Sequence, residues 1–317
     1  MPCDLDTPKK RTDLFYSFNH ERGKSMRSIR ITKTRPFPLL FLTLFSFLTC
    51  AVLSPAARAD DSSVPTGSFS TDILSQYIFR GLANSDGSAV IEPSFTATWE
   101  GFSANIWGNF DTSRHSANSF LPMGNEEGNS KWSETDFTFS YTKELAKNFS
   151  VLIGNVYYGL QSPLGYGPFL NQDEDELFGG VSYNFPWLTV AFTTYGEVIH
   201  SYDEYFELDL SKVIPVPFLD WVCKGTTLNL GTSFGYLILN HDTNTLALDG
   251  RTGSFSDFDT CLLDAALAFP VNKWLSVSPK IGLWLPLTSK ANDYLEANSL
   301  DQKAIHFYGG INLTATF

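Results

Sequence analysis

Apolar and polar side chains alternate along most of the chain from residue 66 onward. In the last segment Phe307 and Ile311 fall on one face of an extended strand, while His306 and Asn312 fall on the other. An alternation of period two indicates a strand that separates two unlike environments. Gly, Asn, Asp or Pro closes each segment, as is typical of turns. The pattern predicts twelve strands, over residues 68–80, 88–99, 101–111, 132–142, 148–159, 176–185, 187–199, 202–212, 225–240, 255–269, 274–286 and 304–317.

The connections between these segments alternate between short and long. Those after even-numbered strands are tight, whereas those after odd-numbered strands include 112–131, 160–175, 241–254 and 287–303. One gap, 213–224, should be short and is long. Outer-membrane barrels sort their connections in this way, and a soluble sandwich has no reason to do so.

Aromatic residues flank the tight turns, as in Trp99 with Phe102 and Phe185 with Trp187. Such rings favour the membrane interface. We therefore predict an all-β fold, a transmembrane antiparallel β-barrel of about twelve strands with both of its ends on the short-turn side. A soluble secreted β-sandwich is the alternative.

The N-terminal region has the order of an export signal. Basic residues precede an apolar run over residues 39–53, and Ala57-Arg58-Ala59 follows it. This order predicts a signal peptide region over 1–59 with cleavage after Ala59, and Met26 is an alternative start. A short periplasmic segment over 60–67 and an outer-membrane barrel over 68–317 would follow. A membrane anchor that stays attached is the other interpretation.

Charge narrows the choice of partners. Removing the ten basic and four acidic side chains of residues 1–59 leaves 12 basic against 30 acidic ones, a net charge of −18. Such a surface repels polyanions, so we expect no nucleic-acid partner. The expected location is the outer membrane of a Gram-negative bacterium. Expected partners are outer-membrane lipids, lipopolysaccharide, and the barrel-assembly machinery, which would engage the C-terminal strand ending in Phe317.

Three short stretches carry a resemblance to a known family. They are Ser70-Thr71-Asp72-Ile73-Leu74-Ser75-Gln76-Tyr77-Ile78-Phe79-Arg80-Gly81, the turn Ser85-Asp86-Gly87, and Gly101-Phe102-Ser103-Ala104-Asn105-Ile106-Trp107-Gly108-Asn109. They resemble the opening of the TorF family of porin-like Gram-negative outer-membrane proteins, in which a strand ends in aromatic-Arg-Gly and a Gly-aromatic hairpin leads into a Trp-Gly strand. The resemblance implies a small pore-like barrel without defined catalytic residues.

If the polar side chains at alternate strand positions point inward, they line a candidate lumen. The predicted pore-lining residues are Asp72, Gln76, Arg80, Glu92, Asn105, Asp136, Glu197, Glu207, Asp264, Lys280 and His306, with Glu176 and Asp209 as further acids. An acidic, water-filled lumen favours cations. Alternatively, these groups form structural ion pairs in a filled interior. Arg80 could clamp a solute carboxylate or balance neighbouring acids.

Other candidate chemistry is weak. The sequence His115-Ser116-Ala117-Asn118 lies in a predicted loop, without a spacing that sets Ser116 against a base, so we predict no enzyme and no catalytic residues. Asp173-Glu174-Asp175-Glu176 lacks the ligand spacing of a calcium loop, and the His and Cys residues lack zinc spacing. No metal or other cofactor is expected, and pairing of Cys223 with Cys261 stays open.

The predicted function is a porin-like passive pathway for small hydrophilic solutes, with a preference for cations through its acidic lumen. The first alternative is a non-conducting structural or recognition barrel with acidic surface loops. The second is an outer-membrane lipid-modifying enzyme.

Overall fold

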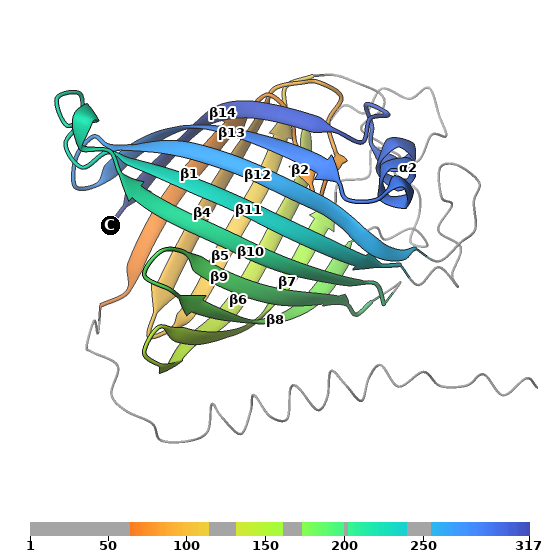
Figure 1. Cartoon of the computed structure of the whole chain (residues 1–317), viewed down its shortest axis with the longest axis horizontal. Helices are drawn as coiled ribbons and strands as arrows, with labels where there is room; N and C mark the ends of the chain where they lie inside the picture. Colours follow the sequence, from red (N-terminus) through yellow and green to blue (C-terminus); the bar gives the residue numbers. More distant parts are fainter. Residues whose placement is uncertain (1–63, 114–130, 161–172, 200–201, 240–254) are drawn as a thin grey trace, which may run out of the picture. The chain divides into compact units, whose positions relative to one another are not determined.

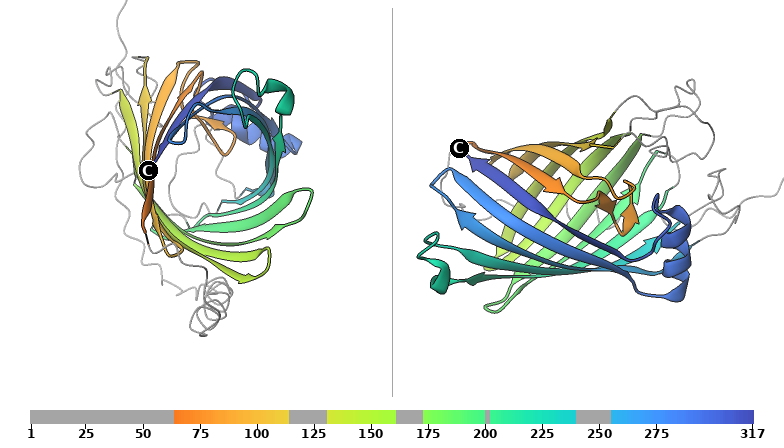
Figure 2. Two further views of the ribbon diagram at one scale, coloured as in Figure 1. Left: turned by 90° about the vertical axis from the view of Figure 1, so that its left-hand side faces the viewer. Right: turned by 90° about the horizontal axis from the view of Figure 1, so that it is seen from above.

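A computed structural model of the chain describes residues 64–113, 131–160, 173–199, 202–239 and 255–317. Twelve antiparallel strands close into a barrel, each hydrogen-bonded to its neighbours along the chain (Figures 1 and 2). They are β1 (Thr66–Leu74), β4 (Val90–Trp99), β5 (Phe102–Asp111), β6 (Trp132–Ala146), β7 (Phe149–Leu160), β8 (Glu174–Asn184), β9 (Thr189–Glu197), β10 (Glu204–Pro215), β11 (Thr227–Ile238), β12 (Ser256–Pro270), β13 (Leu275–Pro286) and β14 (His306–Thr316). The predicted fold and strand number are confirmed. The predicted signal peptide, its cleavage after Ala59 and the start at Met26 lie outside the described residues.

Pairing of the first strand with the last closes the barrel. Ile73 of β1 lies opposite Ile91 of β4 on one side and Ile311 of β14 on the other. At the end of this seam Gly67 donates its N–H to the Phe317 carbonyl at 2.8 Å, and Phe317 donates to the Gly67 carbonyl at 2.9 Å. A closed barrel leaves no exposed strand edge, which satisfies the backbone of its strands within lipid.

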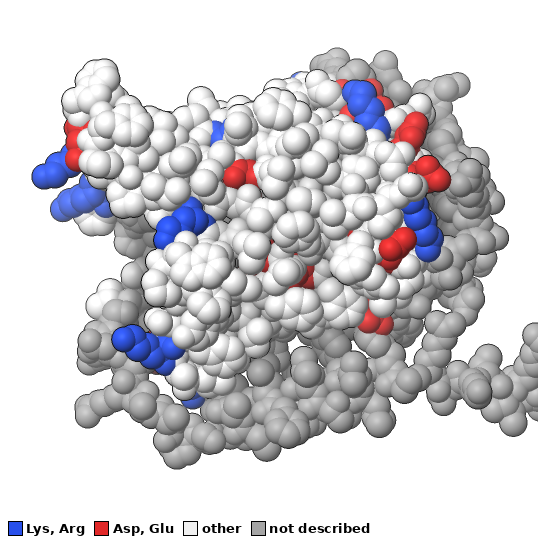
Figure 3. Space-filling view, in the orientation of Figure 1, with Lys and Arg blue, Asp and Glu red and all other residues white. Residues whose placement is uncertain are grey.

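The two faces of the strands meet different surroundings. Outward side chains such as Phe139, Ile106 and Ile311 are large, apolar and roughly half exposed. Inward neighbours of opposite parity include Asp136 and Glu92, which are 9% and 8% exposed. In Figure 3 the middle of the visible outer surface is mostly uncharged, and charged side chains gather toward its two ends. This is the apolar band of a barrel that spans a membrane.

Aromatic rings gather at the tight-turn end. Phe102 lies 4.6 Å from Tyr141 between ring centroids, and Phe185 lies 4.5 Å from Tyr183 and 5.7 Å from Trp187. Rings of this kind favour the interface between acyl chains and water. The aromatic rings of the tight turns therefore lie together at one end of the barrel, as the predicted membrane interface requires.

The long gap over 213–224 remains on the tight-turn side. After β10 the chain forms the 3-10 helix η1 (Pro217–Leu219) before β11 begins at Thr227. Asp220 accepts a hydrogen bond from Gly225 N at 2.9 Å, and the Thr226 hydroxyl donates to the Cys223 carbonyl at 2.6 Å. The gap is thus a folded turn, and it hides no further barrel strand.

One helix was not predicted. Helix α2 (Ser289–Asn298) occupies the connection between β13 and β14, and the Thr288 hydroxyl caps it by accepting from Ala291 N at 3.1 Å. Its buried residues are Ala291 and Leu295 only. The sequence predicts only a long connection over 287–303, because one apolar pair at spacing four is too short a pattern to indicate a helix. Within the described ranges, no helix has the length and apolar character needed to cross a membrane.

Candidate functional site

A second small sheet lies inside the barrel. Strands β2 (Ile78–Phe79) and β3 (Leu82–Ala83) pair with each other and with no barrel strand. Figure 2, left, shows this orange hairpin within the ring of strands. We call residues 75–89, which connect β1 to β4, the lumen hairpin.

The predicted strand over 68–80 was therefore wrong at its C-terminal end, because β1 leaves the wall after Leu74. Leu74 points inward and packs with Tyr77, Val90, Trp284 and Tyr308 in a buried apolar cluster. An apolar residue at an inward position favours packing inside the lumen over continued pairing with the wall. Gln76 and Arg80 consequently lie on the lumen hairpin and not on a barrel strand.

The base of the lumen hairpin is tied to one side of the wall. The Tyr77 hydroxyl donates to Glu134 of β6 at 3.0 Å, and its ring centroid lies 5.5 Å from that of Trp107 of β5. The hairpin also bonds to itself, since Tyr77 N donates to the Ser85 hydroxyl at 2.9 Å and Asn84 N donates to the Tyr77 carbonyl at 2.9 Å. These contacts make the base a fixed part of the interior.

The tip reaches the other side of the wall through Arg80. Both terminal guanidinium nitrogens donate to Glu176 of β8, at 2.7 and 2.8 Å. The guanidinium carbon lies 4.7 Å from the ring centroid of Tyr195 of β9 and 4.3 Å from that of Tyr205 of β10. The Tyr158 hydroxyl of β7 also donates to Glu176, at 2.9 Å. Of the two roles predicted for Arg80, this geometry matches the one that balances neighbouring acids.

The lumen hairpin consequently crosses the whole lumen. In the closed strand order β9 lies opposite β1, because five strands separate the two in either direction. The hairpin starts from β1, and its tip contacts β8, β9 and β10. A side chain from a segment that starts at one side of the barrel thus pairs with the opposite side, so the hairpin forms a bar across the interior.

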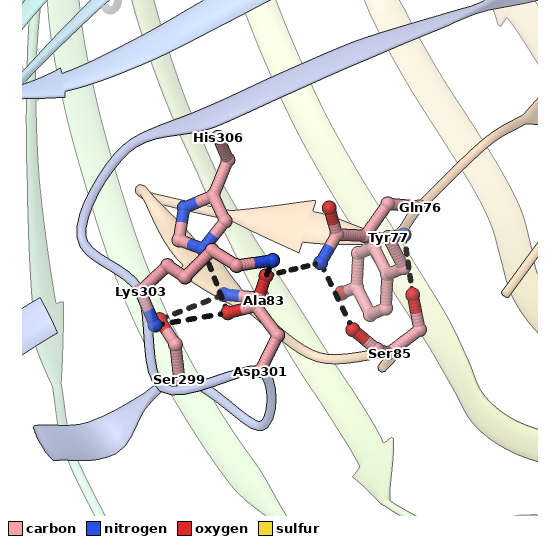
Figure 4. A network of polar contacts seen from close by, with 8 residues as sticks. All are labelled: Gln76, Tyr77, Ala83, Ser85, Ser299, Asp301, Lys303 and His306. Carbon is pink, nitrogen blue, oxygen red and sulfur yellow. Dashed lines mark hydrogen bonds and ion pairs between the residues drawn. The ribbon is translucent and has the colours of Figure 1, made fainter. Parts of the chain in front are cut away.

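A third attachment joins the lumen hairpin to the loop between α2 and β14. Leu300 N donates to the Ala83 carbonyl at 2.9 Å, and Ala83 N donates to the Ser299 hydroxyl at 3.2 Å. Figure 4 shows Asp301 between Gln76 and His306. Gln76 Nε2 donates to one Asp301 oxygen at 3.1 Å, and His306 Nε2 lies 3.0 Å from the other.

Asp301 is the electrostatic centre of this attachment. Burial opposes its ionisation, but hydrogen bonds with His306 and Gln76, together with the charge of His306, lower the pKa of Asp301 below its ordinary value. Lys303 adds an ion pair at 3.6 Å. The carboxylate therefore holds the hairpin and the loop together in its charged form.

All eleven predicted pore-lining residues lie on the inner side of the barrel or on the lumen hairpin within it. Asp72 faces Glu92 across β1 and β4, and Lys280 approaches Asp72 at 3.3 Å. Asn105 donates to the hydroxyls of Ser94 and Thr96, at 2.7 and 2.8 Å. The remaining members are Gln76, Arg80, Asp136, Glu197, Glu207, Asp264 and His306. Their role in passage stays a prediction.

The predicted set does not form one cluster. Glu197 ends β9 and accepts from the backbone N–H groups of Ile199 and Tyr202, at 2.8 and 2.9 Å. Glu207 and Asp264 face the interior from β10 and β12. The acids are thus distributed around the wall and along it, as a field that a solute would meet throughout its passage.

Several functional residues were missed. Glu134 shares the inward parity of Asp136, so alternation alone could have found it. The tyrosines of the Arg80 environment, Tyr158, Tyr195 and Tyr205, also occupy inward positions. No sequence signal connects them to Arg80, because the contact depends on the hairpin folding back across the barrel.

The remaining candidate chemistry concerns the cysteines, a metal site and the His115–Asn118 stretch. Both cysteines of the described ranges are free: Cys223 donates from its thiol to the Pro270 carbonyl at 3.2 Å, and Cys261 is buried in β12. No group of three or more His, Cys, Asp or Glu side chains in the described ranges could hold a metal ion. The residues His115 to Asn118 lie outside the described residues, so the structure adds nothing on the enzyme alternative.

Comparison with known proteins gives likeness of fold alone. No protein-family model and no curated protein matches the sequence, so the TorF family remains a resemblance. Among solved structures, the chain is similar to the NanC porin, with TM-score 0.46, 9% identity, and 78% of this chain and 98% of that chain covered. It is also similar to an outer membrane channel from Pseudomonas putida F1, with TM-score 0.41, 11% identity, and 83% of this chain and 99% of that chain covered. A third similar structure is an anion-selective porin from Comamonas acidovorans, with TM-score 0.31, 10% identity, and 80% of this chain and 99% of that chain covered.

Proposed function

We propose that this protein is a porin-like barrel of a Gram-negative outer membrane that gives passive passage to small hydrophilic solutes. The observation that carries the proposal is a closed barrel whose outer face is apolar and whose inner face is polar. Small hydroxyl and amide residues occupy the inward positions toward the tight turns, among them Ser94, Thr96, Asn105, Thr138, Ser278 and Asn312. A lining of this kind suits a hydrated interior.

The lumen hairpin supports a small size limit for solutes. Because it runs from β1 to the opposite wall, passage in this conformation is confined to the space beside it. Small solutes fit this proposal better than folded or polymeric cargo.

Charge supports a preference for cations. The acids that face the interior in the described ranges include Asp72, Glu92, Glu134, Asp136, Glu174, Glu176, Glu207, Asp209, Asp259 and Asp264, whereas the basic side chains there are Arg80 and Lys280. Arg80 is already paired with Glu176 and Lys280 with Asp72. The excess of carboxylates lowers the energy of a cation in the pathway relative to an anion.

Planar-bilayer recording tests the proposal. Purified protein in a salt gradient should conduct and give a reversal potential of the sign that cation selectivity produces. Stable anion preference would contradict the charge argument, and a correctly folded barrel without conductance would contradict the pathway itself. Heat-modifiable gel migration of the outer-membrane fraction checks that the protein under test is the folded barrel.

The second candidate function is a non-conducting structural or recognition barrel. The lumen hairpin favours it, because three separate attachments hold this segment across the interior. Outer-membrane lipids, lipopolysaccharide and the assembly machinery that engages the Phe317 strand are proposed partners under either function. Removal of the lumen hairpin distinguishes the two candidate functions. A barrel that does not conduct because this segment closes it should begin to conduct when the segment is removed.

A further inference from the structure

The barrel wall supplies a carboxylate, a hydroxyl and two aromatic rings to the guanidinium group of Arg80, and Phe79 of the lumen hairpin adds a third ring at 4.8 Å. Glu176 presents both carboxylate oxygens and is 8% exposed on its side chain. The Tyr158 hydroxyl holds one of these oxygens at 2.9 Å, and Tyr195 and Tyr205 place their rings against the bound cation. These four residues, which we call the guanidinium pocket, all come from β7 to β10 and none from the lumen hairpin.

The chemistry of the guanidinium pocket favours guanidinium over ammonium. A carboxylate that accepts two parallel hydrogen bonds matches the planar fork of a guanidinium, whereas an ammonium is a point charge. Aromatic faces within about 6 Å of a cation add attraction, and the flat guanidinium also stacks on them. The pocket therefore recognises a chemical group, independently of the chain that carries it.

The occupant of the guanidinium pocket is held at the tip of a tight turn. Arg80 has φ +48° and the next residue, Gly81, has φ +83°. The left-handed region disfavours residues that carry a side chain, so Arg80 reaches the pocket in a costly backbone conformation. Gly81 lies close against Thr260 and Leu295, where a larger residue would collide. The occupant thus belongs to a segment under local strain, while the pocket belongs to the rigid wall.

We propose that the guanidinium pocket is a binding site for guanidinium-bearing solutes and that Arg80 occupies it as an internal ligand. A solute that takes the place of Arg80 detaches the tip of the lumen hairpin from the opposite wall. The site thereby couples binding of one solute class to release of the bar across the pathway. The coupling to passage rests on the proposed function, whereas binding to the guanidinium pocket does not.

Calorimetric titration of the detergent-solubilised full barrel with methylguanidinium tests the site directly. Arg80→Ala should bind one methylguanidinium per chain, and wild type should bind at least about tenfold more weakly, because the solute must first displace Arg80. Methylammonium should bind Arg80→Ala much more weakly than methylguanidinium. Absence of binding to folded Arg80→Ala, or equal affinity for the two cations, would overturn the proposal.

Two double variants locate the binding. Arg80→Ala with Glu176→Gln should lose methylguanidinium binding, and Arg80→Ala with Glu100→Gln should keep it, because Glu100 lies exposed in the tight turn between β4 and β5. Should Arg80→Ala not fold, Arg80→Lys serves instead, since lysine keeps the charge but lacks the planar fork. Arg80→Lys should bind methylguanidinium more tightly than wild type, and equal or weaker binding would count against the proposal.

Bilayer recording then separates this inference from the proposed function. Millimolar methylguanidinium should increase the conductance of wild type, and the same concentration of methylammonium should not. A barrel that binds methylguanidinium without ever conducting would contradict the porin function and leave the binding site standing. A conducting barrel whose Arg80→Ala form binds no methylguanidinium would contradict the site and leave the porin function standing.

Discussion

At the scale of residues, neighbouring side chains on one strand face different media. Phe139, in the middle of β6, is 56% exposed on the outer face, whereas Thr138 beside it points inward. The change in the free energy of unfolding caused by a substitution should therefore depend more on whether the side chain faces outward or inward than on the residue type.

Placing a charge at Phe139 tests this difference. Phe139→Arg should destabilise the barrel by up to about 2–4 kcal/mol, the cost of an arginine at the bilayer midplane, because the guanidinium meets the acyl chains. The measurement is the free energy of unfolding in urea for protein refolded into lipid vesicles. The matched control is Thr138→Arg, which should cost much less, since its charge enters a hydrated and acidic interior. Equal costs at the two positions would mean that β6 has no lipid-facing side.

Asp301 gives a pH-dependent prediction at the same scale. Its pKa is lowered in the folded state by His306 and Gln76, against the effect of burial. A carboxylate with a depressed folded pKa contributes stability that is fully present above its unfolded pKa, near 4, and is lost as the pH falls through the folded pKa.

Asp301→Asn should therefore lower stability at neutral pH and reduce the loss of stability on acidification. Urea unfolding midpoints of wild type and variant, compared between neutral and strongly acidic pH, measure the effect. Asp86→Asn is the matched control, because Asp86 is an exposed carboxylate of the same lumen hairpin. A variant whose midpoints run parallel to wild type through the acidic range would show that Asp301 does not act as an ionised clamp.

At the scale of elements, the lumen hairpin is the part of the structure that would limit passage under the proposed function. Its base is fixed by Tyr77, its tip by Arg80 and its return strand by the contact of Ala83 with Leu300. Because these attachments lie at different points of the hairpin, loss of the Arg80 contact should free the tip while the base and the return strand stay attached.

Replacing residues 75–89 by a flexible Gly-Ser linker tests the element as a whole. Single-channel conductance should rise by about twofold or more, because the narrowest part of a pathway dominates its resistance. The control is a Gly-Ser replacement of residues 217–224 in the connection between β10 and β11, whose side chains Phe218 and Trp221 are exposed, and it should leave conductance unchanged. Unaltered conductance after removal of the hairpin would place the limiting constriction elsewhere.

Elements also show what the sequence could and could not predict. The barrel strands were predictable because one environment is lipid and the other is mostly polar, which favours alternation such as that of Phe102, Ala104 and Ile106 against Ser103 and Asn105. The lumen hairpin breaks this rule. Its residues from Leu74 to Phe79 are apolar enough to pass for a strand, and only the inward direction of Leu74 and Tyr77 reveals a different partner. The contact of Arg80 with Glu176 joins residues 96 positions apart, and no local pattern encodes such a distance.

At the scale of the whole molecule, the charge of the interior should act as a field. Carboxylates from β1, β4, β6, β8, β10 and β12 face the interior, so removing any one of them changes the total little. Fields from distributed charges are screened over about 10 Å at 0.1 M salt and about 3 Å at 1 M. Selectivity that comes from such a field must therefore depend on ionic strength.

Reversal potentials in potassium chloride gradients of constant ratio and rising mean concentration measure that dependence. The permeability ratio of potassium to chloride should exceed one near 0.1 M and fall toward one near 1 M. The pair Glu207→Gln with Asp264→Asn should lower the ratio at low salt, and Lys280→Gln should raise it, because the first change removes negative charge and the second removes positive charge. A ratio that stays high at 1 M would point to a specific cation site in close contact with the ion, and a ratio below one at low salt would mean that the carboxylates do not govern the pathway.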